Sequence, residues 1–232
     1  EIPYYEVPIM QKKFIQKCNN AGKMVITATQ MLDSMTENPN PTRAEVSDVA
    51  NAIFDVTGAI MLSGESAMGK YPVKCVETMN KIATAVEENI KYWKRYTRRE
   101  HDLKDMNYEF NLSHSVTSTA MEMQAKAIFA YTQTGNTPRM VASFLPSCPI
   151  YAITNNEKTY RQLSLCWDTT PILIKDKTKP NDVISAGIEE AKKKGYVQEG
   201  DIVVIAGGAS IVSSKDLGEE AMNRTIGGVL KI

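Results

Sequence analysis

Hydroxyl, amide and carboxylate side chains close two short apolar stretches near the start of the chain. The first stretch ends in Thr29 and Gln30, and the second ends in Ser63 and Glu65. Parallel sheets and barrels keep their chemistry at the carboxyl ends of their strands. A hydroxyl there both donates and accepts, so it can hold an oxyanion or pass a proton through ordered water. The residues alone leave a second interpretation open, in which these groups only satisfy a strand end and cap the following turn.

Two βα units would position these side chains. Residues 24–28 and 59–62 are apolar runs of strand length, and the segment between them reads as a turn leading into a helix. Thr42 and Glu45 form a T-x-x-E capping box at the start of that helix. Flanking helices are predicted over Val7–Cys18 and from Pro72 onward. Such units are neighbours in one barrel or one doubly wound sheet.

Three strings in this part of the chain, in this order and spacing, resemble the pyruvate kinase family. They are Thr27-Ala28-Thr29-Gln30-Met31-Leu32, Pro41-Thr42-Arg43-Ala44-Glu45-Val46-Ser47-Asp48-Val49-Ala50-Asn51-Ala52 and Met61-Leu62-Ser63-Gly64-Glu65-Ser66-Ala67. The resemblance rests on specific motifs up to about Glu88. Beyond that residue it rests only on the alternation of strands and helices. Glu1-Ile2-Pro3 is similar to the interior of the family, so we expect the C-terminal part of a longer enzyme.

The resemblance and the later pattern together imply an α/β protein of two parts. Residues 1–92 are expected to be the last βα units of a TIM barrel, and residues 93–232 a three-layer αβα regulatory domain. Its sheet should have five mostly parallel strands, the last one antiparallel. A helix is predicted over Asn181–Lys194, closed by Gly195 in a left-handed cap. The strands are predicted at Ala127–Tyr131, Pro149–Ile153, Thr170–Ile174, Asp201–Ala206 and Ile226–Ile232.

The resemblance also implies roles for individual residues. Thr29 matches the threonine that contacts the substrate beside the enolate of pyruvate, with Gln30 next to it. Ser63 and Glu65 would join a relay to ordered water that helps protonate the enolate carbon. Arg43 matches an arginine near a subunit interface; by its residue type alone it is equally a solvated first-turn arginine, slightly disfavoured by the helix dipole.

A second site is predicted in the later part, where a hydroxyl-rich loop follows a strand and opens a helix. Backbone amides, hydroxyls and the helix dipole there could cradle a phosphate, although such a turn is also a common helix N-cap. The resemblance implies a phosphorylated sugar or nucleotide as effector, yet the loop itself carries no cation. The segment Gly207-Gly208-Ala209-Ser210 could close over it, although these residues also suit an ordinary flexible loop. Lys215 or Arg224 could supply the charge if the segment after Gly208 folds over the site. The loop consists of Thr132, Gln133, Thr134, Gly135, Asn136 and Thr137.

The composition argues against nucleic acid and membranes as partners of this chain. Lys plus Arg and Asp plus Glu both number 27, so no net positive field attracts nucleic acid or an anionic membrane. No apolar run approaches the roughly 20 residues of a membrane span, and no signal region opens the chain. Four cysteines without paired spacing suit free thiols in the cytoplasm better than disulfides or a metal site.

The family resemblance implies phosphoryl transfer from phosphoenolpyruvate to ADP, with Mg²⁺ and K⁺ bound by residues outside this chain, in a homotetramer. This chain alone is expected to be inactive. A rival interpretation is an autonomous α/β module that binds a phosphorylated ligand without catalysis. Another barrel enzyme using the same strand ends would need metal or Schiff-base residues of its own, and no convincing set is visible.

Overall fold

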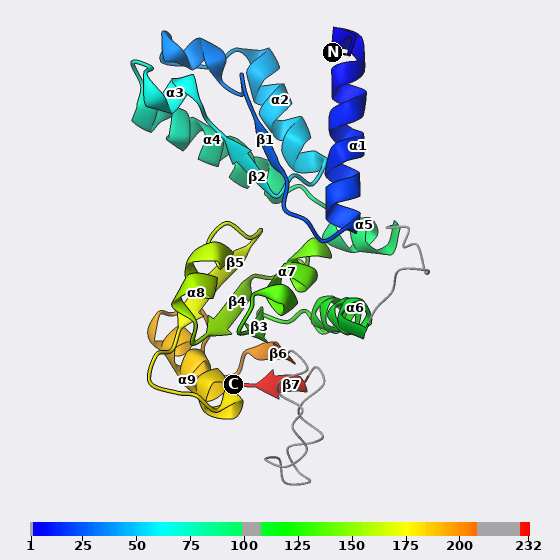
Figure 1. Ribbon diagram of the computed structural model, residues 1–232, viewed down its shortest axis with the longest axis vertical. Coiled ribbons are helices and arrows are strands. Elements are labelled where there is room, and N and C mark those ends of the chain that lie inside the picture. Colours follow the sequence, from blue (N-terminus) through cyan, green and yellow to red (C-terminus); the bar gives the residue numbers. More distant parts are fainter. Residues whose placement is uncertain (1, 99–107, 208–227) are drawn as a thin grey trace. The chain divides into compact units, whose positions relative to one another are not determined.

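The computed structural model describes residues 2–98, 108–207 and 228–232. The chain divides into two compact units, Glu1–Lys91 and Tyr92–Ile232 (Figure 1). Within the described parts, no helix is both long enough and apolar enough to pass through a bilayer. Several predicted features lie outside the described residues, namely Gly208, Ala209, Ser210, Lys215, Arg224 and the first two residues of the last strand.

The first unit contains two βα units, as expected. Strands β1 and β2 pair in parallel, with Ala28 opposite Met61 at their carboxyl ends. The capping box is confirmed: Thr42 Oγ1 accepts from the Glu45 amide at 3.3 Å, and the Glu45 carboxylate accepts from the Thr42 amide at 2.7 Å. The elements are η1 (Tyr4–Glu6), α1 (Val7–Asn20), β1 (Ile26–Ala28), η2 (Asp33–Thr36), α2 (Arg43–Phe54), β2 (Ala59–Met61), α3 (Gly64–Ala67) and α4 (Pro72–Glu87).

The hydrophobic core of the first unit includes residues of the loop that follows β1. Met31, Leu32 and Met35 from this loop are buried against Val49 of α2 and Cys75 of α4, together with Ala52 and Met79. Met31, Leu32 and Met35 therefore anchor this loop in the packed interior, although Thr29 and Gln30 before them are exposed.

The second unit is built on a five-stranded sheet in the order β5-β4-β3-β6-β7. The pairs β5-β4, β4-β3 and β3-β6 are parallel and β6-β7 is antiparallel, which confirms the predicted mostly parallel sheet. The elements are α5 (Tyr92–Arg98), α6 (Tyr108–Glu122), β3 (Ala127–Tyr131), α7 (Asn136–Ser143), β4 (Ile150–Thr154), α8 (Glu157–Leu163), β5 (Thr169–Leu173), α9 (Pro180–Lys193), β6 (Ile202–Gly207) and β7 (Gly228–Lys231).

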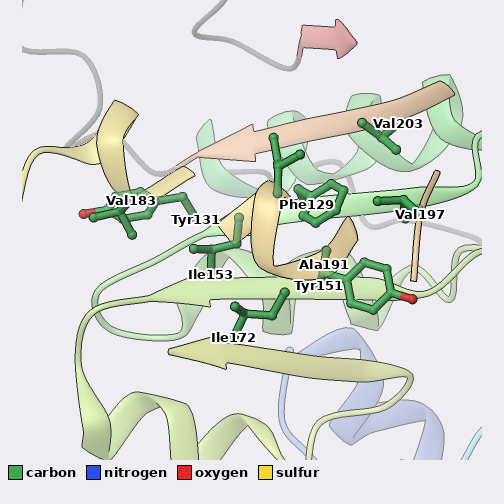
Figure 2. Close-up of a cluster of buried hydrophobic side chains, with 11 residues drawn as sticks. Phe129, Tyr131, Tyr151, Ile153, Ile172, Val183, Ala191, Val197 and Val203 are labelled. Carbon is green, nitrogen blue, oxygen red and sulfur yellow. The ribbon is translucent and has the colours of Figure 1, made fainter. Parts of the chain in front are cut away.

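Two apolar clusters cover the two faces of this sheet and make the three layers. On one face, Phe129, Ile153 and Ile172 from three neighbouring strands pack with Val183 and Ala191 of α9 (Figure 2). On the other face, α6 and α7 supply Val116, Ala120, Val141 and Ala142. Helix α9 lies close to the sheet at Gly187. A methyl group added there would come within 2.6 Å of Ile153, so the position has no room for a side chain. The outer strand β5 carries Pro171 at its centre.

Candidate functional site

Thr29 and Gln30 follow β1 in a strained conformation. Their φ angles are 79° and 55°, in the left-handed region that costs a non-glycine residue about 1–2 kcal/mol. A β-branched residue such as Thr29 is a genuine outlier there. Both side chains are exposed. Strain of this kind persists only where the surrounding structure determines it, and it gathers at functional sites.

Glu65 holds the loop that carries these two residues. Its side chain is only 2% exposed. One carboxylate oxygen accepts from the amide of Leu32 at 3.1 Å, and the other accepts from the amide of Ser63 at 2.7 Å. Burial raises the pKa of this carboxyl, but the hydrogen bonds from backbone amides outweigh burial and leave the pKa below its ordinary value. Glu65 therefore joins the two strand-end loops as an anion.

Glu45 holds the same loop from the side of α2. Its carboxylate accepts from the amide of Ser34 and from the Ser34 hydroxyl, both at 2.6 Å, in addition to its bond with Thr42. Burial raises the pKa of Glu45, and these hydrogen bonds lower it further than burial raises it. Glu45 thus both caps α2 and holds the loop at Ser34, and the capping motif predicts only the first of these contacts.

The structure brings four of the predicted site residues to one edge. Thr29, Gln30, Ser63 and Glu65 all lie at the carboxyl ends of the paired strands β1 and β2. Ser63 is exposed like Thr29, whereas Glu65 turns inward. Arg43 is the first residue of α2, and its side chain is exposed. Relay roles for Ser63 and Glu65 and an interface role for Arg43 stay predictions.

The predicted phosphate loop lies where ligands bind in doubly wound sheets. The chain leaves β3 toward β4, while β6 lies on the other side of β3. Such a reversal of strand order opens a crevice at the carboxyl ends of the strands. The loop from Thr132 to Gly135 starts at the end of β3, directly at this switch point.

Internal hydrogen bonds fix the shape of this loop. The buried Thr132 hydroxyl accepts from the amide of Gly135 at 2.8 Å, and Gly135 has a φ of 89°. The Thr159 hydroxyl of α8 donates to the carbonyl of Gln133 at 2.7 Å. These bonds occupy backbone groups inside the loop and leave Thr134 and Asn136 exposed.

The loop is not an ordinary side-chain N-cap. Gly135 is at the cap position of α7, and no side chain of the described residues caps this helix. The amides of Asn136 and Thr137 therefore remain available to an anion, whereas Pro138, the third residue of the helix, has no N–H to offer. Thr137 lies in that turn, partly buried, and Asn136 opens the helix.

Arg139 is a cation beside the loop that was not among the residues predicted from the sequence. One guanidinium nitrogen donates to the carbonyl of Thr134 at 3.3 Å and another to Gln162 Oε1 at 3.4 Å. Its position four residues after Gly135, one helical turn away, is the signal that could have revealed it. The loop thus has a positive charge beside it within the described residues, although none of the six loop residues is basic.

Two family models match this chain, both from one protein family. The model described as pyruvate kinase, barrel domain, matches residues 1–76. The model described as pyruvate kinase, alpha/beta domain, matches residues 111–217. The chain belongs to the pyruvate kinase family. The fold expected from the resemblance is confirmed by both models and by the parallel strand pairing in both units.

Several pyruvate kinases are similar to this chain. One from Sporosarcina psychrophila is 47% identical over 211 residues, which is 91% of this chain and 36% of that protein. One from Clostridium acetobutylicum is 49% identical over 208 residues, 90% of this chain and 44% of that protein. A crystal structure of a pyruvate kinase from Cryptosporidium parvum superposes with a TM-score of 0.87 at 31% identity, covering 100% of this chain and 44% of that one. The chain spans less than half the length of these relatives.

The described residues contain no group of three or more His, Cys, Asp and Glu side chains placed to hold an ion. Mg²⁺ prefers several oxygen ligands in near-octahedral geometry. The described residues therefore offer no such ligand set for a magnesium ion.

Proposed function

We propose that this chain supplies the strand-end lip of the barrel and the α/β domain of a pyruvate kinase. The complete enzyme would transfer the phosphoryl group of phosphoenolpyruvate to ADP, giving ATP and pyruvate in glycolysis. The strained, exposed pair Thr29 and Gln30 at the end of β1 carries this proposal. The proposed enzyme is a cytoplasmic homotetramer that uses Mg²⁺ and K⁺ bound elsewhere in the protein, with Arg43 near a subunit interface.

Within this reaction, the chain's own residues would act after phosphoryl transfer. The Thr29 hydroxyl is proposed to hold the enolate oxygen or an ordered water beside it, since a fixed donor stabilises charge that develops in the transition state. The exposed Ser63 hydroxyl on the neighbouring strand end would pass a proton to the enolate carbon through water.

Turnover by the complete protein tests the catalytic proposal. Pyruvate formation from phosphoenolpyruvate and ADP can be followed with a coupled assay. Turnover by the complete protein supports a pyruvate kinase. Binding of a phosphorylated ligand with no turnover would instead favour the rival, a regulatory α/β module without catalysis.

The second unit is proposed to bind a phosphorylated sugar or nucleotide at the loop Thr132–Thr137. The uncapped start of α7, the switch point of the sheet and the adjacent Arg139 support this proposal. One cation suits a single phosphate better than two, so we expect preference for a monophosphate. Other cations, such as Lys215 and Arg224, are candidates from outside the loop.

Titration calorimetry on this chain decides the effector proposal. Glucose 6-phosphate, ribose 5-phosphate, AMP and fructose 1,6-bisphosphate are the four ligands to compare. Thr134→Ala combined with Thr137→Ala, and separately Arg139→Gln, should weaken binding of whichever ligand binds the wild type. Arg161→Gln is the matched control, because Arg161 pairs with Glu157 on the exposed side of α8. Unaltered binding in the loop variants would reduce the loop to a structural turn.

A further inference from the structure

We infer that Glu45 and Glu65 are positioning residues that together fix the left-handed turn at Thr29 and Gln30. The two carboxylates accept hydrogen bonds from residues that follow this turn, Glu45 from α2 and Glu65 from α3, just after β2. This inference rests on the proposed function, because it assigns how the Thr29 hydroxyl is kept in place for the reaction.

The contact of Glu65 requires a carboxylate. Both of its oxygens accept from backbone amides, those of Leu32 and Ser63. An ionised carboxylate only accepts hydrogen bonds, whereas a glutamine offers one oxygen and one NH₂ group. Glu65→Gln would therefore keep the volume of the side chain but place a donor against one of the two amides. Leu32, whose side chain is fully buried, is only two residues from Gln30.

Glu45 makes the second contact, with Ser34, which is two residues after Leu32. It accepts from both the amide and the hydroxyl of Ser34. Its own position is set by the helix start, because the same side chain accepts from the Thr42 amide. The loop after the strained turn is thus fixed at Leu32 by one carboxylate and at Ser34 by the other.

Apolar packing alone would not fix this turn. Met31, Leu32 and Met35 are buried in the core of the first unit, but burial of apolar area is non-directional. It would allow the loop to relax toward the ordinary right-handed or extended regions at Thr29. Hydrogen bonds to backbone amides specify the orientation of the loop. Glu65 accepts from the amides of Leu32 and Ser63, and Glu45 accepts from those of Ser34 and Thr42.

The test uses Glu65→Gln and Glu45→Gln in the complete protein. A misplaced catalytic group costs on the order of tenfold to a hundredfold in rate. We expect kcat to fall by roughly that factor in each variant, with the KM for phosphoenolpyruvate changed less than about threefold. The shape of the pH–rate profile should stay the same, because a positioning carboxylate contributes no ionisation to the rate. Loss of one limb of the profile in Glu65→Gln would overturn the inference in favour of a proton relay.

Controls separate this inference from the proposed function and from simple misfolding. Glu37→Gln alters an exposed carboxylate of the same region that pairs with Lys70, and its kcat should equal that of the wild type. Thr29→Ala tests the function: if it leaves kcat unchanged, the proposed role of Thr29 fails. If Thr29→Ala lowers kcat and the two glutamine variants do not, the positioning inference fails alone.

A milder variant covers the case in which both glutamine variants fail to fold. Ser34→Ala removes only the hydroxyl contact of Glu45 and keeps the amide contact. Hydrogen exchange at the amides of Leu32 and Ser34 should then speed up several-fold, and kcat should fall while exchange in α2 stays unchanged. Normal kcat with faster exchange at Ser34 would contradict the inference.

Discussion

The guanidinium group of Arg139 lies against the α-carbon of Gly135. A methyl group added to that glycine would come within 3.0 Å of the guanidinium carbon and of one of its nitrogens. Gly135 also has a φ of 89°, in the region that L side chains rarely adopt. The glycine is therefore needed twice, for the turn itself and for the close approach of the cation to the loop.

Gly135→Ala should lower the free energy of unfolding and weaken binding of a phosphorylated ligand. The left-handed conformation alone costs alanine about 1–2 kcal/mol, and displacement of Arg139 removes the charge beside the loop. The matched control is Gly195→Ala, which has a φ of 71° with no atom within 4 Å of the added methyl. Urea unfolding and calorimetry should show the conformational cost in both variants and loss of binding only in Gly135→Ala. Equal binding by the two would separate Arg139 from the ligand.

Substitutions at Thr29 should uncouple stability from activity in the complete enzyme. Thr29→Ser keeps the hydroxyl and should retain most of the turnover. Thr29→Gly removes the hydroxyl but relieves the strain at φ 79°, so it should be more stable by roughly 1 kcal/mol and nearly inactive. Loss of one donor to a developing oxyanion lowers kcat about 10²- to 10³-fold. Full turnover in Thr29→Gly, measured with thermal unfolding on the same sample, would leave Thr29 a purely structural residue.

His114 should make the second unit less stable in mild acid. Its ring stacks on Tyr96, with centroids 5.1 Å apart, and meets Phe144 edge-on at 5.6 Å. Burial lowers its pKa below the usual value of 6.5. The unfolded chain then takes up a proton more readily, so stability present above about pH 6.5 is lost as the pH falls through the lower folded-state pKa.

The matched variant for this effect is His114→Phe, which keeps an aromatic ring at the position and cannot be protonated. Urea midpoints at pH 7.5 and pH 5.0 should differ more for the wild type than for the variant. The extra loss in the wild type should stay under about 1.4 kcal/mol for each pH unit crossed. Parallel pH curves for the two proteins would show that His114 is not the titrating group.

This chain alone should form no pyruvate and should associate in solution. Its first unit exposes apolar side chains on a two-stranded parallel sheet, including Ile26, which is 45% exposed. Open strands with apolar side chains favour association. Ile26→Lys should shift sedimentation toward the monomer, whereas Met123→Lys, at a position 42% exposed in the second unit, should not. A wild-type chain that stays monomeric over a wide concentration range, or that sustains turnover, would contradict the prediction.

Much of the fold could be predicted from local pattern. The strand predicted at Ala127–Tyr131 has those bounds in β3, and the helix predicted at Asn181–Lys194 is α9, shifted by one residue. Gly195 adopts the predicted left-handed conformation after that helix. These segments combine a clear apolar period with a cap or a turn residue, so local preference and tertiary packing agree.

The geometry of the site could not be predicted in the same way. No residue preference indicates a left-handed turn at Thr29, because threonine disfavours it and only distant contacts hold it there. Glu65 belongs to a residue type that is rarely buried, yet two amides far apart in sequence require its charge. Arg139 folds back on a loop whose own residues are neutral. The turn at Thr29 and the burial of Glu65 depend on contacts between residues far apart in sequence, whereas the spacing of Arg139 from Gly135 was a local signal.

Pro171 at the centre of the outer strand β5 has a practical consequence for anyone who handles the protein. A strand with proline lacks one backbone donor and is a poor template for a further strand, while β1 and β2 contain no proline. Precipitate formed during storage or concentration should therefore grow from the open strands of the first unit rather than from the β5 edge of the second. Mild proteolysis that removes the residues before Tyr92 should leave a remainder with a much longer shelf life, suited to ligand screening.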